Sequence, residues 1–180
     1  MTEQKTKGTF FREMVKPFLV LTVICLAVSA LLGFTNYVTK PVIEQNEALQ
    51  AEATRRAVLP EADGFTEIAS EGYEGVRSIY RADNGVGYVI TASAQGYKGE
   101  ITVTVGFDES GAVVGLNADV STETVGIGTK AGSDAYLANY MGLTEGAGAA
   151  VDTITSATYS SRAVRQAIDY AMAACAGVRG

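Results

Sequence analysis

Two polar stretches of the sequence contain the residues best suited to bind an anionic ligand. The first is DTITSATYSS, residues 152–161, in which six hydroxyl side chains directly precede a helical pattern. These hydroxyls belong to Thr153, Thr155, Ser156, Thr158, Ser160 and Ser161. The first backbone N–H groups of a helix lack intrahelical partners and carry partial positive charge, so they suit a phosphate, and hydroxyls add donors. The alternative is N-capping of the helix, although one cap would be sufficient.

The second polar stretch is STETVGIGTKAG, residues 121–132. Gly126 and Gly128 allow the backbone to approach a ligand closely and to present N–H groups, and Glu123 and Lys130 supply charges of opposite sign. The spacing differs from a dinucleotide-binding fingerprint and from a Walker-type loop. A flexible connector between a strand and a helix is therefore the alternative interpretation.

The rest of the composition excludes several kinds of redox and hydrolytic site. Histidine is absent, which excludes a histidine-based triad, a typical zinc site and a histidine-ligated haem. Cys25 and Cys175 are too few to hold an iron–sulfur cluster and too far apart in the predicted organisation to form a disulfide. Redox chemistry in this chain would require an organic cofactor.

A long apolar segment near the start predicts a membrane anchor. Residues 17–39 contain no charged side chain, and a helix of that length covers roughly 34 Å, enough to cross a bilayer. The alternative is a cleaved signal peptide, because AVSA at residues 27–30 resembles a cleavage site, but the apolar character continues through Val38. Four bases precede the span and one follows it closely, so we expect residues 1–16 in the cytoplasm and the rest outside.

The region beyond the span predicts one α+β domain carried by the anchor. Residues 40–60 read as a membrane-proximal helix that ends at Pro60, and residues 61–180 as the extracytoplasmic domain. After Pro41 there are nine basic and eighteen acidic residues, an acidic balance that disfavours nucleic acid as a partner. Four runs with strand patterns, VRSIYRA, VGYVITASA, EITVTVGF and AVVGLNADV, predict a mostly antiparallel sheet.

Two helical patterns follow these strands. SDAYLANYM predicts a short helix capped by Ser133, and the segment after the hydroxyl cluster predicts a longer helix that ends at Gly177. The longer helix has one apolar stripe, which we expect to pack on the sheet. The stripe consists of Ala163, Val164, Ala167, Ile168, Ala171 and Met172.

The first polar stretch resembles the flavinylation motif of the FMN-binding domain family. That motif is an aspartate, two variable residues, serine or threonine, a small residue, alanine and threonine, and here it reads DTITSAT from Asp152 to Thr158. ETVGIGTK is similar to the loop that lines the flavin in that family, and GYKGEITVTVGF to the strands before it. Anchor, order and length together resemble the G subunits of Rnf electron-transport complexes. Val125, Thr122 and Ser156 stand where the family often has proline, histidine and glycine.

The resemblance implies one covalent FMN per chain, attached by a phosphoester to the Thr158 hydroxyl. A separate magnesium-dependent flavin transferase would make this bond, taking FMN from FAD and releasing AMP. The other residues implied at the cofactor are Thr155, Ser156, Ala157, Glu123, Thr124, Gly126, Ile127, Gly128 and Lys130. Ser160 and Ser161 are expected to cap the helix or face solvent.

The implied function is that of an electron relay in a complex that couples electron transfer from ferredoxin to NAD with sodium or proton translocation. Its partners would be the other membrane and peripheral subunits of that complex. Two alternatives remain at this point: a C-type subunit of the sodium-pumping NADH:quinone reductase, and a membrane-tethered sensor or binding module without flavin.

Overall fold

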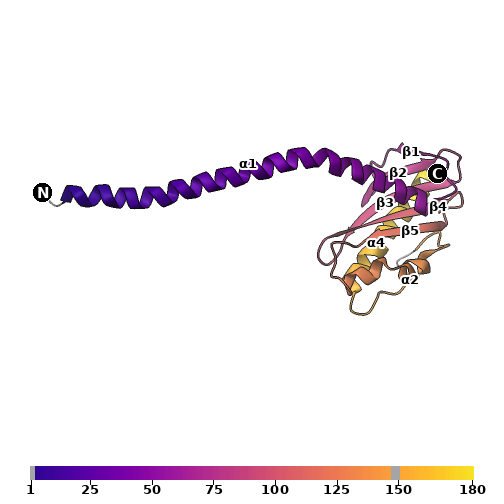
Figure 1. Ribbon diagram of the computed structural model, residues 1–180. Coiled ribbons are helices and arrows are strands. Elements are labelled where there is room, and N and C mark those ends of the chain that lie inside the picture. Colours follow the sequence, from indigo (N-terminus) through magenta and orange to yellow (C-terminus); the bar gives the residue numbers. More distant parts are fainter. Residues whose placement is uncertain (1–2, 147–150) are drawn as a thin grey trace. The chain divides into compact units, whose positions relative to one another are not determined.

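The computed structural model describes residues 3–146 and 151–180, and it begins with one long helix. Helix α1 covers Glu3–Val58 and contains Pro17 and Pro41 (Figure 1). The membrane span and the membrane-proximal helix predicted from the sequence are therefore parts of a single helix. Pro41 has no N–H to donate, but the loss of this one hydrogen bond does not end the helix. By length and composition, the segment Val15–Val58 is able to cross a membrane.

The chain divides into two compact units, residues 1–50 and 51–180, and the second contains the sheet. The sheet has five strands in the order β1-β2-β3-β4-β5, and every neighbouring pair is antiparallel. The strands are β1 Phe65–Ile68, β2 Val76–Ala82, β3 Gly87–Gln95, β4 Glu100–Asp108 and β5 Val113–Asp119. The four predicted strands are confirmed as β2 to β5, and β1 is an additional edge strand.

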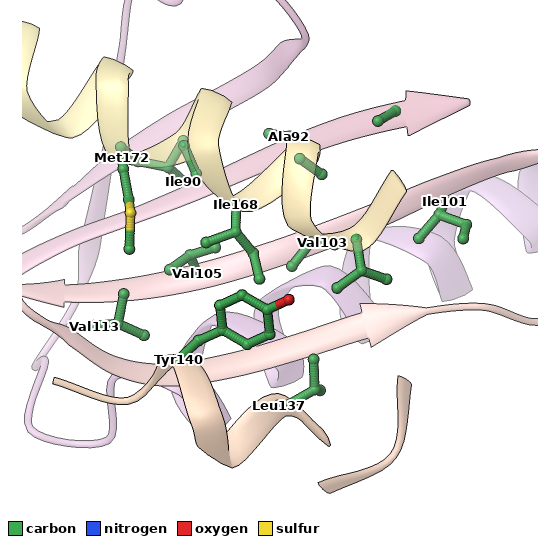
Figure 2. Packing of buried hydrophobic residues seen from close by; sticks show 14 of the residues in the cluster. Ile90, Ala92, Ile101, Val103, Val105, Val113, Leu137, Tyr140, Ile168 and Met172 are labelled. Carbon is green, nitrogen blue, oxygen red and sulfur yellow. The ribbon is translucent and has the colours of Figure 1, made fainter. Parts of the chain in front are cut away.

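One face of the sheet is covered by helix α4, Thr158–Arg179 (Figure 1). All six residues of the predicted apolar stripe are buried, which confirms that this face of the helix packs on the sheet. Figure 2 shows Ile168 pointing toward Tyr140 and Met172 pointing toward Val113 in this core. The helix continues past Gly177 to Arg179, so the predicted end was wrong; a Cβ at Gly177 would lie 2.6 Å from the Tyr73 hydroxyl.

The opposite face of the sheet packs against the C-terminal end of α1. Val58 and Leu59 are buried there with Val89 of β3. The carbonyl oxygen of Val58 lies so close to the sheet that a Cβ at Gly106 or Gly115 would approach it within 2.3 or 2.1 Å. Glycine at these two positions therefore permits a close backbone contact between helix and sheet.

Short helical turns join the sheet to α4. These are η1 Gly128–Gly132, α2 Asp134–Leu137 and η2 Ala138–Tyr140. Ser133 occupies the N-cap position of α2 as predicted, but its hydroxyl donates to the Lys130 carbonyl at 2.7 Å and does not cap the helix. Cys175 belongs to α4 and lies in the core, where burial raises the pKa of its thiol to about 11. A thiol that is protonated at neutral pH is a poor nucleophile.

Candidate functional site

Both polar stretches identified in the sequence contribute to one cleft. The cleft has a volume of about 270 Å³ and lies between the β3–β4 hairpin loop, the loop after β5 and the start of α4. Its walls consist of Tyr97, Glu123, Thr124, Ile127, Gly128, Ser156, Ala157, Thr158, Tyr159 and Ser160. Residues separated widely in the sequence therefore form a single surface large enough to hold part of a small-molecule ligand.

Thr158 is the first residue of α4 and lines this cleft. The N-cap residue is Ala157, and no side chain caps the N-terminus of the helix. The Ser161 N–H donates to the Ala157 carbonyl at 2.9 Å, so the earlier N–H groups of the first turn remain available to a ligand. Interpreting the hydroxyl cluster as a set of helix caps is therefore wrong.

Ser160 and Ser161 were expected to cap the helix or face solvent, and this expectation was wrong. Ser160 is buried and donates to Oε2 of Glu123 at 2.7 Å. Ser161 is also buried, donates to the Ala157 carbonyl at 2.8 Å, and accepts from the Ile154 N–H at 3.2 Å. The Ser160 hydroxyl thus connects the start of α4 to the loop after β5, and the Ser161 hydroxyl holds the turn before the helix against its first turn.

Ser156 has a left-handed backbone conformation, with φ of 72°. Among the described residues it is the sole non-glycine residue with positive φ. A Cβ in this region causes a steric cost, which glycine avoids. The unusual conformation turns the chain immediately before Ala157 and Thr158, so it contributes to presenting Thr158 at the cleft.

Glu123 is the buried charge of the site, with 4% of its surface exposed. Its Oε1 accepts from the Lys98 N–H at 3.0 Å, and its Oε2 accepts from Ser160. Burial raises the pKa of Glu123, but the hydrogen bonds from Ser160 and from the backbone N–H groups of Lys98, Gly99 and Tyr97 together lower it below the usual value. Glu123 is therefore a carboxylate whose oxygens are already occupied by protein donors.

The glycine-containing loop provides a narrow wall beside Glu123. A Cβ at Gly128 would lie 2.6 Å from Oε2 of Glu123 and 2.8 Å from the Ser160 hydroxyl, so no side chain fits there. Gly126 has φ of 77° and donates its N–H to the Thr129 hydroxyl at 2.9 Å. Specific hydrogen bonds thus hold the loop in place. The alternative interpretation of this stretch as a flexible connector therefore does not describe it.

The structure brings together seven of the ten residues predicted at the cofactor. Those seven are Glu123, Thr124, Ile127, Gly128, Ser156, Ala157 and Thr158. The other three, Thr155, Gly126 and Lys130, are exposed outside the cleft wall.

Tyr97 and Tyr159 line the cleft and were not identified from the sequence. Tyr97 lies between glycines in the hairpin loop, and Tyr159 directly follows Thr158. An aromatic residue in a glycine-rich turn, where no core is available to it, is the feature that could have revealed Tyr97.

Sequence comparison relates both parts of the chain to known families. Residues 96–173 match the FMN-binding domain, and residues 1–58 match the RnfG N-terminal region. The G subunit of the Na(+)-translocating ferredoxin:NAD(+) oxidoreductase complex of Acetobacterium woodii is 30% identical over 178 residues, covering 84% of this chain and 86% of that protein. The G subunit of the proton-translocating ferredoxin:NAD(+) oxidoreductase complex of Clostridium ljungdahlii is 26% identical, with the same coverage.

A similar protein occurs in Methanosarcina acetivorans. This protein, the G subunit of an ion-translocating oxidoreductase complex, is 28% identical over 185 residues, covering 90% of this chain and 96% of its own length. The similarity thus extends over the anchor, the sheet and the cleft, and the chain belongs to the family of G subunits of Rnf-type ion-translocating oxidoreductase complexes.

Proposed function

We propose that this chain is a membrane-bound electron-relay subunit that carries FMN attached by a phosphoester to Thr158. The observation that carries the proposal is the position of Thr158, which lies on the wall of the cleft and at the uncapped N-terminus of a 22-residue helix. The match of residues 96–173 to the FMN-binding domain supports a flavin as the ligand. One attachment residue implies one cofactor per chain.

The residues of the cleft fit a phosphorylated flavin. The free N–H groups of the first turn of α4 would stabilise the remaining negative charge of a phosphodiester. Thr124, Ile127 and Gly128 would contact the ring, since they offer one hydroxyl, one apolar side chain and open backbone. Asp152 lines a different hollow with Tyr136 and Asn139, so its charge is not on the cleft wall.

In this role the chain's residues bind and orient the cofactor. FMN, when bound, would supply reversible uptake and release of electrons. Covalent attachment would prevent loss of the cofactor by dissociation, which matters if the domain lies outside the cytoplasm as the flanking charges predict. A separate flavin transferase would form the bond from FAD, with the Thr158 oxygen as acceptor and AMP as the leaving group.

The chain is a membrane protein of a multisubunit complex, and we propose that it passes electrons between redox centres of its partner subunits. The names of its relatives support an Rnf-type complex over the sodium-pumping quinone reductase, because they describe ferredoxin:NAD(+) oxidoreductases that translocate ions. The coupled ion differs between those relatives, so copurification of the native complex and ion-dependent activity assays would identify it.

Intact mass spectrometry of the full chain tests the attachment. Coexpression with a flavin transferase should add the mass of one FMN less one water, and Thr158→Ala should abolish the addition. Thr155→Ala is the matched control, since Thr155 belongs to the same motif but lies outside the cleft wall. It should retain the cofactor. Retention of flavin by Thr158→Ala would contradict the proposed attachment site.

A further inference from the structure

Two exposed tyrosines from different segments of the chain line the cleft. Tyr97 extends from the β3–β4 hairpin loop and is 68% exposed, and Tyr159 extends from the first turn of α4 and is 69% exposed. Their ring centroids are 6.1 Å apart, and the ring planes are tilted by 44°. Side chains this exposed contribute little to the core, so packing does not explain why two aromatic rings meet at the cleft.

Glu123 fixes the backbone positions of both tyrosines. Its Oε1 accepts from the N–H of Lys98, the residue after Tyr97, and its Oε2 accepts from the hydroxyl of Ser160, the residue after Tyr159. The carboxylate is buried between the two segments. One side chain therefore sets the separation between the two backbone segments that carry the rings.

We propose that Tyr97 and Tyr159 form an aromatic clamp for the planar isoalloxazine ring, with Glu123 as the residue that positions both sides. This inference rests on the proposed attachment of FMN to Thr158. An aromatic ring stacked between two others needs about 7 Å between the outer rings, twice the usual contact distance between carbon atoms. The observed separation of 6.1 Å between tilted rings is close to that value, so small side-chain rotations would admit the flavin.

The position of the attachment residue agrees with a clamp. Thr158 directly precedes Tyr159, so a cofactor attached there begins next to one of the two rings. The isoalloxazine ring is electron-poor and the phenol ring is electron-rich, which favours stacking between them. A phosphoester alone leaves the ring free to rotate about several single bonds. The clamp would restrict that rotation and give the cofactor a defined orientation toward its electron-transfer partner.

Fluorescence of the attached flavin tests the clamp in the full flavinylated chain. Tyrosine in contact with an excited flavin quenches it by electron transfer, whereas phenylalanine stacks similarly but quenches poorly. We expect the double variant Tyr97→Phe/Tyr159→Phe to lengthen the flavin fluorescence lifetime several-fold, and each single variant to lengthen it less because the other tyrosine still quenches, all without faster anisotropy decay. We expect Tyr97→Leu and Tyr159→Leu to lengthen the lifetime and also to add a rapid anisotropy component, because the ring is then released.

Tyr88→Phe is the matched control, since Tyr88 lines a different hollow with Arg179 at the far end of α4. It should leave both readouts unchanged. Glu123→Ala should lengthen the lifetime although both tyrosines remain, because their spacing is lost. A natural chain without covalent flavin after coexpression with the transferase would contradict the attachment proposal instead. Flavinylated Tyr97→Phe and Tyr159→Phe chains with the lifetime of Tyr88→Phe would overturn the clamp while leaving attachment at Thr158 intact.

Discussion

The hydroxyl oxygen of Ser160 lies 2.7 Å from Oε2 of Glu123, and both side chains are buried. This contact joins the start of α4 to the loop that follows β5. The other carboxylate oxygen of Glu123 accepts from the Lys98 N–H in the hairpin loop. One side chain thus connects the three segments that form the cleft, and several measurable properties should depend on it.

Glu123→Ala should destabilise the domain, because the Lys98 N–H and the Ser160 hydroxyl would lose their shared acceptor. We expect the free energy of unfolding to fall by about 1–3 kcal/mol, the usual cost of an unsatisfied buried polar group. Chemical denaturation followed by tyrosine near-UV circular dichroism measures this, since the chain contains no tryptophan. Glu145→Ala, at an exposed position, is the control and should have little effect. Equal stability of the two variants would contradict a structural role for the Glu123 contacts.

The stability that Glu123 contributes should depend on pH. Its pKa in the folded chain is lowered below the usual 4.5, so the ionised carboxylate stabilises the fold above pH 4.5 and this contribution is lost as the pH falls through the lower, folded-state pKa. Glu123→Gln lacks this ionisation. The difference in unfolding free energy between the natural chain and Glu123→Gln should therefore be largest near neutral pH and decrease in acid. A difference in unfolding free energy that stays the same at all pH values would contradict this prediction.

Gly128→Ala should separate the Glu123–Ser160 pair and reduce cofactor loading. The added methyl group would lie within 3 Å of both side chains, and such overpacking costs about 1–3 kcal/mol. Intact mass after coexpression with the transferase gives the flavinylated fraction, which should fall. Gly126→Asn is the control, because the space around Gly126 is open and asparagine tolerates a positive φ. If Gly128→Ala is fully flavinylated, the close approach of Gly128 to Glu123 and Ser160 is not needed for cofactor loading.

Ser156→Gly should stabilise the chain or leave it unchanged. Glycine removes the left-handed steric cost at φ 72°, about 1–2 kcal/mol, although its greater freedom in the unfolded chain offsets part of the gain. Ser156→Ala keeps the Cβ and loses the hydrogen bond to the Thr155 carbonyl, so it should be less stable than Ser156→Gly. Thermal unfolding of both variants measures the difference. If Ser156→Ala were more stable than Ser156→Gly, the backbone at this position would not be strained.

Local patterns were sufficient to predict most of the fold. Strand β4 alternates buried Ile101, Val103 and Val105 with half-buried residues, and the stripe on α4 has helical periodicity, so both are visible within a short window. Strand β1 is only FTEI, and its existence depends on pairing with β2 at one edge of the sheet. The span and the membrane-proximal helix were predicted as separate elements, but Pro41 removes only one hydrogen bond and leaves the other turns of α1 intact.

The site was predictable where its residues form a local motif. Thr158 and the loop around Gly128 were identified because neighbouring residues define them. The partner of Ser160 is 37 residues away, so its role as a donor to Glu123 could not be read from its neighbours. The same holds for Tyr97, since the hairpin loop reaches the cleft only because the loop after β5 folds back to it.

The hydrogen-bond partners of Glu123 are far apart in the sequence, and this affects the order in which the chain folds and takes up its cofactor. Its partners lie 25 residues before it and 37 residues after it, so the three walls of the cleft do not exist together in an extended chain. Residues 152–158 contain the whole stretch that resembles the flavinylation motif, yet the cleft proposed to receive the flavin ring assembles only after the sheet and α4 have come together. We therefore expect folding of the domain to precede stable seating of the cofactor, and a chain modified before folding would carry its flavin exposed to water.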